Sequence, residues 1–270
     1  MKVVFLHIPK TAGQSVHHFL TTNFPKDSIF PARVNSQTLD YTVDEIKKYN
    51  IYSGHFNMSL LEIVDQPKFV FTILRKPIDR ILSYYFYLRK EARKLSKTEL
   101  NSPNRQGMKA IITLSPDEYF CDESLSIRSF IDDHYDNFYM YYFAMKSYHG
   151  RSYAQKLIEL NLVDINNIYY KAVAVLKNDI NKVYDVSEWN NLAKDLINYF
   201  PNKQFDLKNI VINKGDGKST EDRIKQLINL GATQKTIDRL YNFCEYDDKI
   251  YQSFCPISEQ KPLTDTLSNK

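Results

Sequence analysis

The stretch MKVVFLHIPKTAGQS, residues 1–15, joins a short apolar run to a loop that contains a lysine and a glycine. The run from Val3 to Ile8 is typical of a strand buried on both faces of a parallel sheet. Apolar side chains between residues 16 and 20 then recur at helical spacing. A strand, a loop and a helix in this order favour phosphate binding, because the loop N–H groups and the helix N-terminus attract an anion.

Further apolar runs extend this pattern along the chain. The expected strands are 51–55, 69–74, 171–176 and 209–212, and the expected helices begin at Pro77 and cover 188–199 and 234–251. Buried strands that alternate with helices indicate an α/β protein. We therefore expect a central parallel sheet with helices on both faces.

The length of 270 residues allows one large domain or two small ones. We expect a single domain over 1–257 and a frayed tail over 258–270. The stretch 97–126 is polar and weakly periodic, so it is expected to be an insertion or a lid within the domain.

The bulk composition is that of an ordinary soluble protein. The net charge of +4 permits an anionic ligand without requiring one, and no stretch is apolar enough to span a bilayer. Three cysteines without CxxC spacing, Cys121, Cys244 and Cys255, suggest reduced thiols in the cytoplasm, with a Cys244–Cys255 bridge left open. The abundance of Asn, Lys, Ile and Tyr is compatible with a bacterial source.

Lys10 supplies a full positive charge inside the first loop, and Thr11 and Ser15 offer hydroxyl groups nearby. Pro9 precedes Lys10 where a Walker A loop has glycine, so the GxxxxGK[ST] pattern of nucleotide triphosphatases is absent. A plain strand-to-helix turn with an exposed lysine is the simpler alternative.

A second constellation follows the expected strand 69–74. Arg75 ends this strand, and Ser83 lies eight residues further along the helix that Pro77 opens. The carboxyl ends of strands are where open α/β sheets bind ligands, so an arginine fork and a hydroxyl converge on one anion there. Alternatively, Arg75 caps a turn or pairs with Asp79.

Together these motifs resemble the sulfotransferase superfamily, in the carbohydrate branch that contains heparan sulfate 2-O-sulfotransferase. Residues 7–15, HIPKTAGQS, resemble the loop that binds the 5′-phosphosulfate of 3′-phosphoadenosine 5′-phosphosulfate (PAPS), and Gln14 departs from the usual Ser or Thr. The resemblance implies a P-loop-like three-layer fold. It also implies that the donor is bound by Lys10, Thr11, Ala12, Gly13, Gln14 and Ser15, and that its 3′-phosphate is held by Arg75 and Ser83.

The same resemblance implies that His55, in the segment Gly54–Phe56, is the general base. It also implies that Lys10 takes part in catalysis. A histidine suits the role because its unperturbed pKa lies near 6.5. A loop histidine bonded to the backbone is the plain alternative, Glu62 is a weaker candidate base, and His7 is either a second polar group of the site or part of its strand.

Two later segments carry weaker signals. Lys214 and Gly215 resemble the loop that closes over the nucleotide in this superfamily, although a plain turn explains them equally well. The aromatic run 138–143 and the preceding Asn137 either line an acceptor cleft or fill the core.

The sequence therefore predicts in-line transfer of a sulfuryl group from PAPS to an acceptor hydroxyl, with 3′-phosphoadenosine 5′-phosphate (PAP) as the product. A carbohydrate acceptor is expected, with no metal, no nucleic-acid partner and no membrane span. Two rival hypotheses remain: a small-molecule kinase on a P-loop-like scaffold, and a non-catalytic domain that binds PAP or a sulfated glycan.

Overall fold

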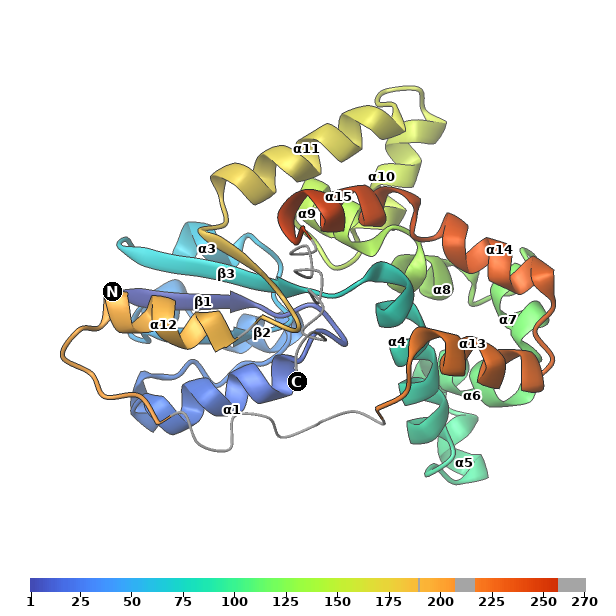
Figure 1. Cartoon of the computed structure of the whole chain (residues 1–270), viewed down its shortest axis with the longest axis horizontal. Helices are drawn as coiled ribbons and strands as arrows, with labels where there is room; N and C mark the ends of the chain where they lie inside the picture. Colours follow the sequence, from blue (N-terminus) through green and yellow to red (C-terminus); the bar gives the residue numbers. More distant parts are fainter. Residues whose placement is uncertain (189, 207–216, 257–270) are drawn as a thin grey trace, which may run out of the picture.

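The computed structural model describes residues 1–188, 190–206 and 217–256. Four parallel strands form one sheet in the order β2-β1-β3-β4 (Figure 1). Their bounds are β1 (Lys2–Leu6), β2 (Ile51–Gly54), β3 (Lys68–Leu74) and β4 (Lys182–Asp185). Helices flank this central sheet, so the expected α/β class is confirmed.

The register brings the carboxyl ends of all four strands to one edge of the sheet. Leu6 at the end of β1 lies between Gly54 of β2 and Thr72 of β3, and Leu74 of β3 pairs with Asp185 of β4. Every residue that directly follows a strand is therefore delivered to the same edge. This arrangement positions the first loop of the chain, His55 and Arg75 as neighbours.

The α-helices are α1 (Gly13–Asn23), α2 (Val43–Lys47), α3 (Leu60–Ile63), α4 (Pro77–Ala92), α5 (Lys97–Leu100), α6 (Gln106–Thr113), α7 (Pro116–Cys121), α8 (Arg128–Tyr135), α9 (Phe138–Met145), α10 (Gly150–Glu159), α11 (Ile165–Asn178), α12 (Asn190–Tyr199), α13 (Thr220–Asn229), α14 (Gln234–Asn242) and α15 (Glu245–Phe254). Short 3₁₀ turns are η1 (Lys26–Ser28), η2 (Asn35–Asp40) and η3 (Pro103–Arg105).

Two hydrophobic clusters cover the two faces of the sheet. On one face, Phe5 of β1 packs with Phe19 of α1 and Leu196 of α12. On the other face, Val4 of β1 belongs to a cluster that includes the buried side chains of α9 and α11. Alternate residues of β1 thus face opposite helical layers, which explains why the whole run is apolar (Figure 1).

A third cluster takes no residue from the four strands and is built around α4, whose place in the fold is seen in Figure 1. The stretch 97–126 forms α5, η3, α6 and α7 and contributes Ile111, Tyr119 and Phe120, all fully buried, to this cluster. Helices α13 and α14 contribute Leu227 and Leu240 to the same cluster. The polar stretch is therefore anchored by a buried aromatic face.

The expected strand at 171–176 is wrong, because these residues lie inside α11. Asp164 caps this helix by accepting hydrogen bonds from the N–H groups of Asn166 and Asn167. Its buried residues are Ile168, Ala172, Val175 and Leu176, which recur with helical rather than strand periodicity. The fourth strand is instead β4, whose sequence KVYD is too polar to indicate a buried strand.

The other expected elements are found with adjusted bounds. Pro77 opens α4, and the expected helix 188–199 corresponds to α12. The expected helix 234–251 is divided into α14 and α15. The expected short strand at 209–212 lies outside the described residues.

The three cysteines are free thiols, so no Cys244–Cys255 bridge forms. These two residues flank the opposite ends of the ten-residue helix α15. At about 1.5 Å of rise per residue, their eleven-residue separation places them roughly 16 Å apart along the axis, beyond the reach of a disulfide. None of the helices in the described part of the chain combines the length and hydrophobicity needed to traverse a bilayer.

Candidate active site

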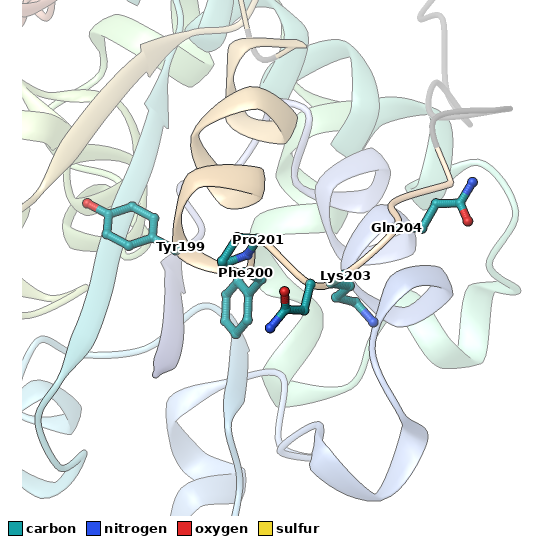
Figure 2. A pocket seen from close by; sticks show the side chains of 6 residues that line it. Tyr199, Phe200, Pro201, Lys203 and Gln204 are labelled. Atoms are coloured by element: carbon teal, nitrogen blue, oxygen red, sulfur yellow. The ribbon is translucent and has the colours of Figure 1, made fainter.

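A cavity of about 2110 Å³ opens at the carboxyl edge of the sheet, bordered by the loops after the strands and by α4 and α13. Its charged and polar lining includes Lys10, Gln14, Ser15, Asn35, Ser36, His55, Asn57, Arg75, Lys76, Asp79, Ser83, Lys90, Glu91, His134, His149, Asp185, Lys218 and Arg223. A smaller hollow of about 600 Å³ is lined by six consecutive residues, 199–204, at the end of α12 (Figure 2). It contains no residue that the sequence predicted to be functional.

The first loop has an unusual backbone shape. Lys10 and Ala12 both have left-handed backbones, with φ of 70° and 61°. For residues with side chains this costs on the order of 1 kcal/mol each, so surrounding contacts must hold the loop. Ala12 stands at the N-cap of α1, where its methyl group cannot cap the helix, and Gly13 to Ser15 form the first turn. The N-terminus of α1 therefore borders the cavity.

Thr11 is the exception among the six predicted loop residues, because it is fully buried and does not line the cavity. Its hydroxyl donates a hydrogen bond of 2.8 Å to the carbonyl oxygen of Ile8. The Thr11 side chain thus closes the loop on itself. The side chain of Lys10 lines the cavity, and its Nζ lies 4.0 Å from the centroid of the Tyr87 ring on α4.

Arg75, directly after β3, and Ser83 on α4 line the same cavity. The hydroxyl of Tyr139, on α9, accepts a hydrogen bond from the Arg75 N–H at 3.2 Å and donates one to the Arg75 carbonyl at 2.7 Å. The main chain at Arg75 is therefore pinned to a buried tyrosine. Ser83 lies one helical turn before Tyr87, so both side chains share the face of α4 that borders the cavity.

His55 lines the cavity just beyond the end of β2. Its Nδ1 lies 2.9 Å from the carbonyl oxygen of His7 and 2.9 Å from the hydroxyl of Tyr148. Burial lowers the pKa of His55, the hydrogen bond to His7 opposes this shift, and the nearby charge of Arg33 adds to it. The imidazole is therefore neutral near pH 7 and able to accept a proton.

His7, left open by the sequence, is a buried member of the site. Its ring stacks on His55 with centroids 4.1 Å apart, and its Nδ1 has no hydrogen-bond partner among the described residues. Burial holds the pKa of His7 well below its usual value, with His55 and Arg33 adding to the effect. Two stacked, neutral imidazoles thus stand at the carboxyl ends of β1 and β2.

The structure places the remaining candidate residues in different parts of the molecule. Glu62 is exposed on α3 and does not line the cavity, so His55 stands as the base candidate there. Lys214 and Gly215 lie outside the described residues. Sequence reasoning missed Tyr148 and Arg223, because neither belongs to a motif. Asn137 is nine-tenths buried or more and serves helix capping rather than the cavity.

Within 1–188, 190–206 and 217–256, no group of three or more His, Cys, Asp or Glu side chains is arranged to hold a metal ion. The described cavity offers cationic side chains, loop N–H groups and neutral imidazoles, beside the carboxylates of Asp79, Glu91 and Asp185.

No individual curated protein matches the chain. The family model described as the sulfotransferase family matches residues 1–252, which includes every described element from β1 to α14 and most of α15. A parallel α/β sheet and a family match over nearly the full length agree, and the chain belongs to the sulfotransferase family.

Proposed function

We propose that this sulfotransferase takes the sulfuryl group from PAPS and transfers it to a hydroxyl group of a carbohydrate. The observation that carries the proposal is the meeting of three features in one cavity: the strained loop at the N-terminus of α1, Arg75 after β3 and His55 after β2. A loop of this shape favours a phosphate or phosphosulfate group, whereas a neutral imidazole favours proton abstraction.

On the donor side, Lys10 and the N–H groups of residues 12–15 would hold the 5′-phosphosulfate, and Arg75 and Ser83 the 3′-phosphate. The fit is supported by the cationic lining, to which Lys218 and Arg223 of the late part of the chain also contribute. Lys214 and Gly215 remain proposed members of this side by resemblance alone. PAPS supplies a sulfuryl group bound to a good leaving group, so no metal is required by the proposal.

On the acceptor side, His55 would remove the proton as the acceptor oxygen forms its bond to sulfur and the bond from sulfur to the phosphate oxygen breaks. Lys10 would stabilise the negative charge that develops on that phosphate oxygen, and PAP would leave. A positioned base typically contributes roughly 10²- to 10⁴-fold to the rate. The acceptor proton ends on His55 and the electron pair on PAP, so the step is balanced.

The side chains that line the cavity around His55 support a carbohydrate as the acceptor. Asn35, Ser36, Asn57 and Tyr148 line this part of the cavity with amide and hydroxyl groups. The N–H of Asn57 donates to the Asn35 side chain at 3.1 Å, and the Asn57 side chain accepts from the Tyr148 N–H at 3.0 Å. A wall of preorganised neutral hydrogen-bonding groups suits the hydroxyls of a sugar.

Calorimetric titration of PAP and of ATP, each with and without Mg²⁺, tests the donor assignment. PAP is expected to bind without Mg²⁺, and Arg75→Ala should weaken it roughly 10- to 100-fold, the loss of one charge-assisted phosphate contact. Lys203→Ala, at the distant hollow of residues 199–204, is the matched control and should bind PAP like the wild type. Binding of ATP with Mg²⁺ in place of PAP would overturn the proposal in favour of a kinase.

His55→Ala separates catalysis from binding. This variant should bind PAP with wild-type affinity and lose sulfuryl transfer to any sugar acceptor that the wild type uses. Wild-type protein that binds PAP but transfers to no hydroxyl acceptor would instead favour a non-catalytic binding domain.

A further inference from the structure

Two segments about ninety residues apart in sequence are joined beside His55. The hydroxyl of Tyr142 donates to the carbonyl of Phe56 at 2.7 Å, and the N–H of Met58 donates to the carbonyl of Lys146 at 3.0 Å. The N–H of Tyr148 donates to the Asn57 side chain at 3.0 Å. The connection between α9 and α10 is thereby fastened to the segment that follows β2, which holds Tyr148 against the imidazole.

The hydrogen bonds around Nδ1 of His55 have only one consistent assignment. One neighbour is the His7 carbonyl oxygen, which can only accept. The other is the Tyr148 hydroxyl, whose hydrogen is already donated to the same carbonyl oxygen of His7. Both neighbours therefore present lone pairs to Nδ1, and the proton of the neutral ring must be on Nδ1.

We infer that Tyr148, together with the main-chain carbonyl of His7, acts as a positioning group that fixes His55 in its Nδ1–H tautomer and leaves the Nε2 lone pair for the acceptor hydroxyl. The inference rests on the proposed function for the role of Nε2, whereas the tautomer itself is independent of any substrate.

The ring contacts support a fixed orientation as well as a fixed tautomer. His7 stacks on one face of the His55 ring, and Tyr148 meets it nearly edge-on at 84°, with centroids 5.6 Å apart. The Tyr148 ring is packed in turn against Phe138 and Tyr142. These contacts leave the Tyr148 hydroxyl little freedom to turn away from Nδ1.

The protonation states of the neighbours agree with this arrangement. Burial holds the pKa of Tyr148 well above its usual value, so the hydroxyl keeps its proton and can donate it to His7. The titratable and charged groups that face His55 are His7, Arg33 and Tyr148. His7 is neutral and Arg33 is cationic, so none of them offers a negative charge that would hold His55 protonated.

The decisive experiment is ¹⁵N NMR of the histidine side chains in the substrate-free, full-length protein, with His55 assigned by its loss in His55→Ala. The expected wild-type spectrum has His55 protonated on Nδ1 and unprotonated on Nε2. Tyr148→Phe removes one acceptor and keeps the packed ring, so the Nε2–H form should become detectable. Tyr52→Phe deletes a buried hydroxyl that donates to the carbonyls of Ile46 and Tyr49 and has no bond to His55 or Tyr148, so it should leave the tautomer unchanged.

Kinetics provide a second readout. Tyr148→Phe should lower kcat about threefold to tenfold, the equivalent of one hydrogen bond, with unchanged PAP affinity. The acid limb of its pH–rate profile should move to lower pH, because the imidazolium loses an acceptor for Nδ1–H. A wild-type His55 found with its proton on Nε2, or a Tyr148→Phe variant with wild-type tautomer, kcat and pH profile, would overturn the inference. Failure of PAP binding would instead overturn the proposed function, while the tautomer measurement would still stand.

Discussion

The ring of His7 occupies the space that any side chain at Gly13 would need. A Cβ atom built on Gly13 would lie 1.7 Å from Nε2 of His7, far inside van der Waals contact. The glycine of the first loop is thus required by the imidazole that precedes the loop, since the His7 ring packs directly over the first residue of α1.

Gly13→Ala should therefore destabilise the protein although alanine is the better helix former. Without a clash, alanine in a helix would gain up to about 1 kcal/mol over glycine. Forcing His7 aside should instead cost roughly 1–3 kcal/mol, as for other overpacked sites. Urea denaturation of the two proteins measures the difference in the free energy of unfolding.

The double variant Gly13→Ala/His7→Ala isolates this contact. With the His7 ring removed, the alanine at position 13 should cost little or nothing, which gives a coupling energy of about 1–3 kcal/mol. An equal cost of Gly13→Ala with and without the His7 ring would contradict the direct clash.

The ring of Tyr87 is expected to hold the ammonium group of Lys10 in place. The cation–π contact at 4.0 Å keeps the ammonium group at the mouth of the loop, and such contacts contribute about 0.5–1 kcal/mol at exposed sites. Tyr87→Leu should weaken PAP binding only a few-fold, whereas Lys10→Ala should weaken it roughly 10- to 100-fold. Calorimetry with both variants tests the ranking.

Tyr241→Leu is the matched control, because it removes another half-exposed tyrosine, on α14, that does not line the cavity. It should bind PAP normally. If Tyr87→Leu weakened binding as strongly as Lys10→Ala, Tyr87 would have to contact the nucleotide itself.

The stability of the protein should fall as the pH drops below 6.5. Burial lowers the pKa of His17 to about 4, with Arg33 and His18 adding to the shift, and burial also lowers the pKa of His134. The unfolded chain then binds protons between pH 6.5 and about 4 that the folded chain rejects. The stabilising contribution of neutral His17 is complete above pH 6.5 and is lost progressively through this window.

His17→Gln should flatten this pH dependence, since glutamine does not titrate. Urea denaturation near pH 7 and near pH 5 provides the comparison. His18→Gln removes an exposed ring that only adds to the His17 shift, so it should retain most of the wild-type dependence. A His17→Gln protein that loses as much stability on acidification as the wild type would refute the assignment.

Asn137 and Asp247 cap each other's helices, so Asn137→Ala should destabilise the fold without changing the site. The Asn137 side chain accepts from the N–H groups of Tyr246 and Asp247 at the start of α15, at 2.7 and 3.2 Å. Asp247 accepts from the N–H groups of Tyr139 and Met140 in α9. Loss of the Asn137 cap should cost about 1–2 kcal/mol of unfolding free energy.

Asn137→Gly separates the cap from the backbone conformation. Asn137 has a left-handed φ of 40°, which glycine adopts freely, so this variant should lose only the cap and be less destabilised than Asn137→Ala. Both variants should bind PAP with wild-type affinity. Weakened PAP binding by folded Asn137→Gly would mean that Asn137 supports the cavity as well as α15.

Much of the fold, and the position of the first loop at the cavity, could be predicted because the signals are local. Residues 69–74 are buried from both faces of the sheet, which explains why Thr72 is the only polar residue in this stretch. The loop at 9–13 needs a lysine, a tight turn and a glycine within a few residues, and all are adjacent in sequence. Such short-range requirements leave a pattern that periodicity and motif reading can recover.

Tertiary contacts decided the elements that lack such a pattern. β4 lies at the edge of the described sheet and is only partly buried, so its sequence KVYD contains no apolar run. Residues 171–176 are apolar enough for a strand, but the Asp164 cap and one buried face stabilise them as part of a helix. Tyr148 reaches His55 only because hydrogen bonds join two segments about ninety residues apart. Contacts between segments so far apart in sequence depend on tertiary packing. The hydrophobic periodicity within one short segment does not specify them.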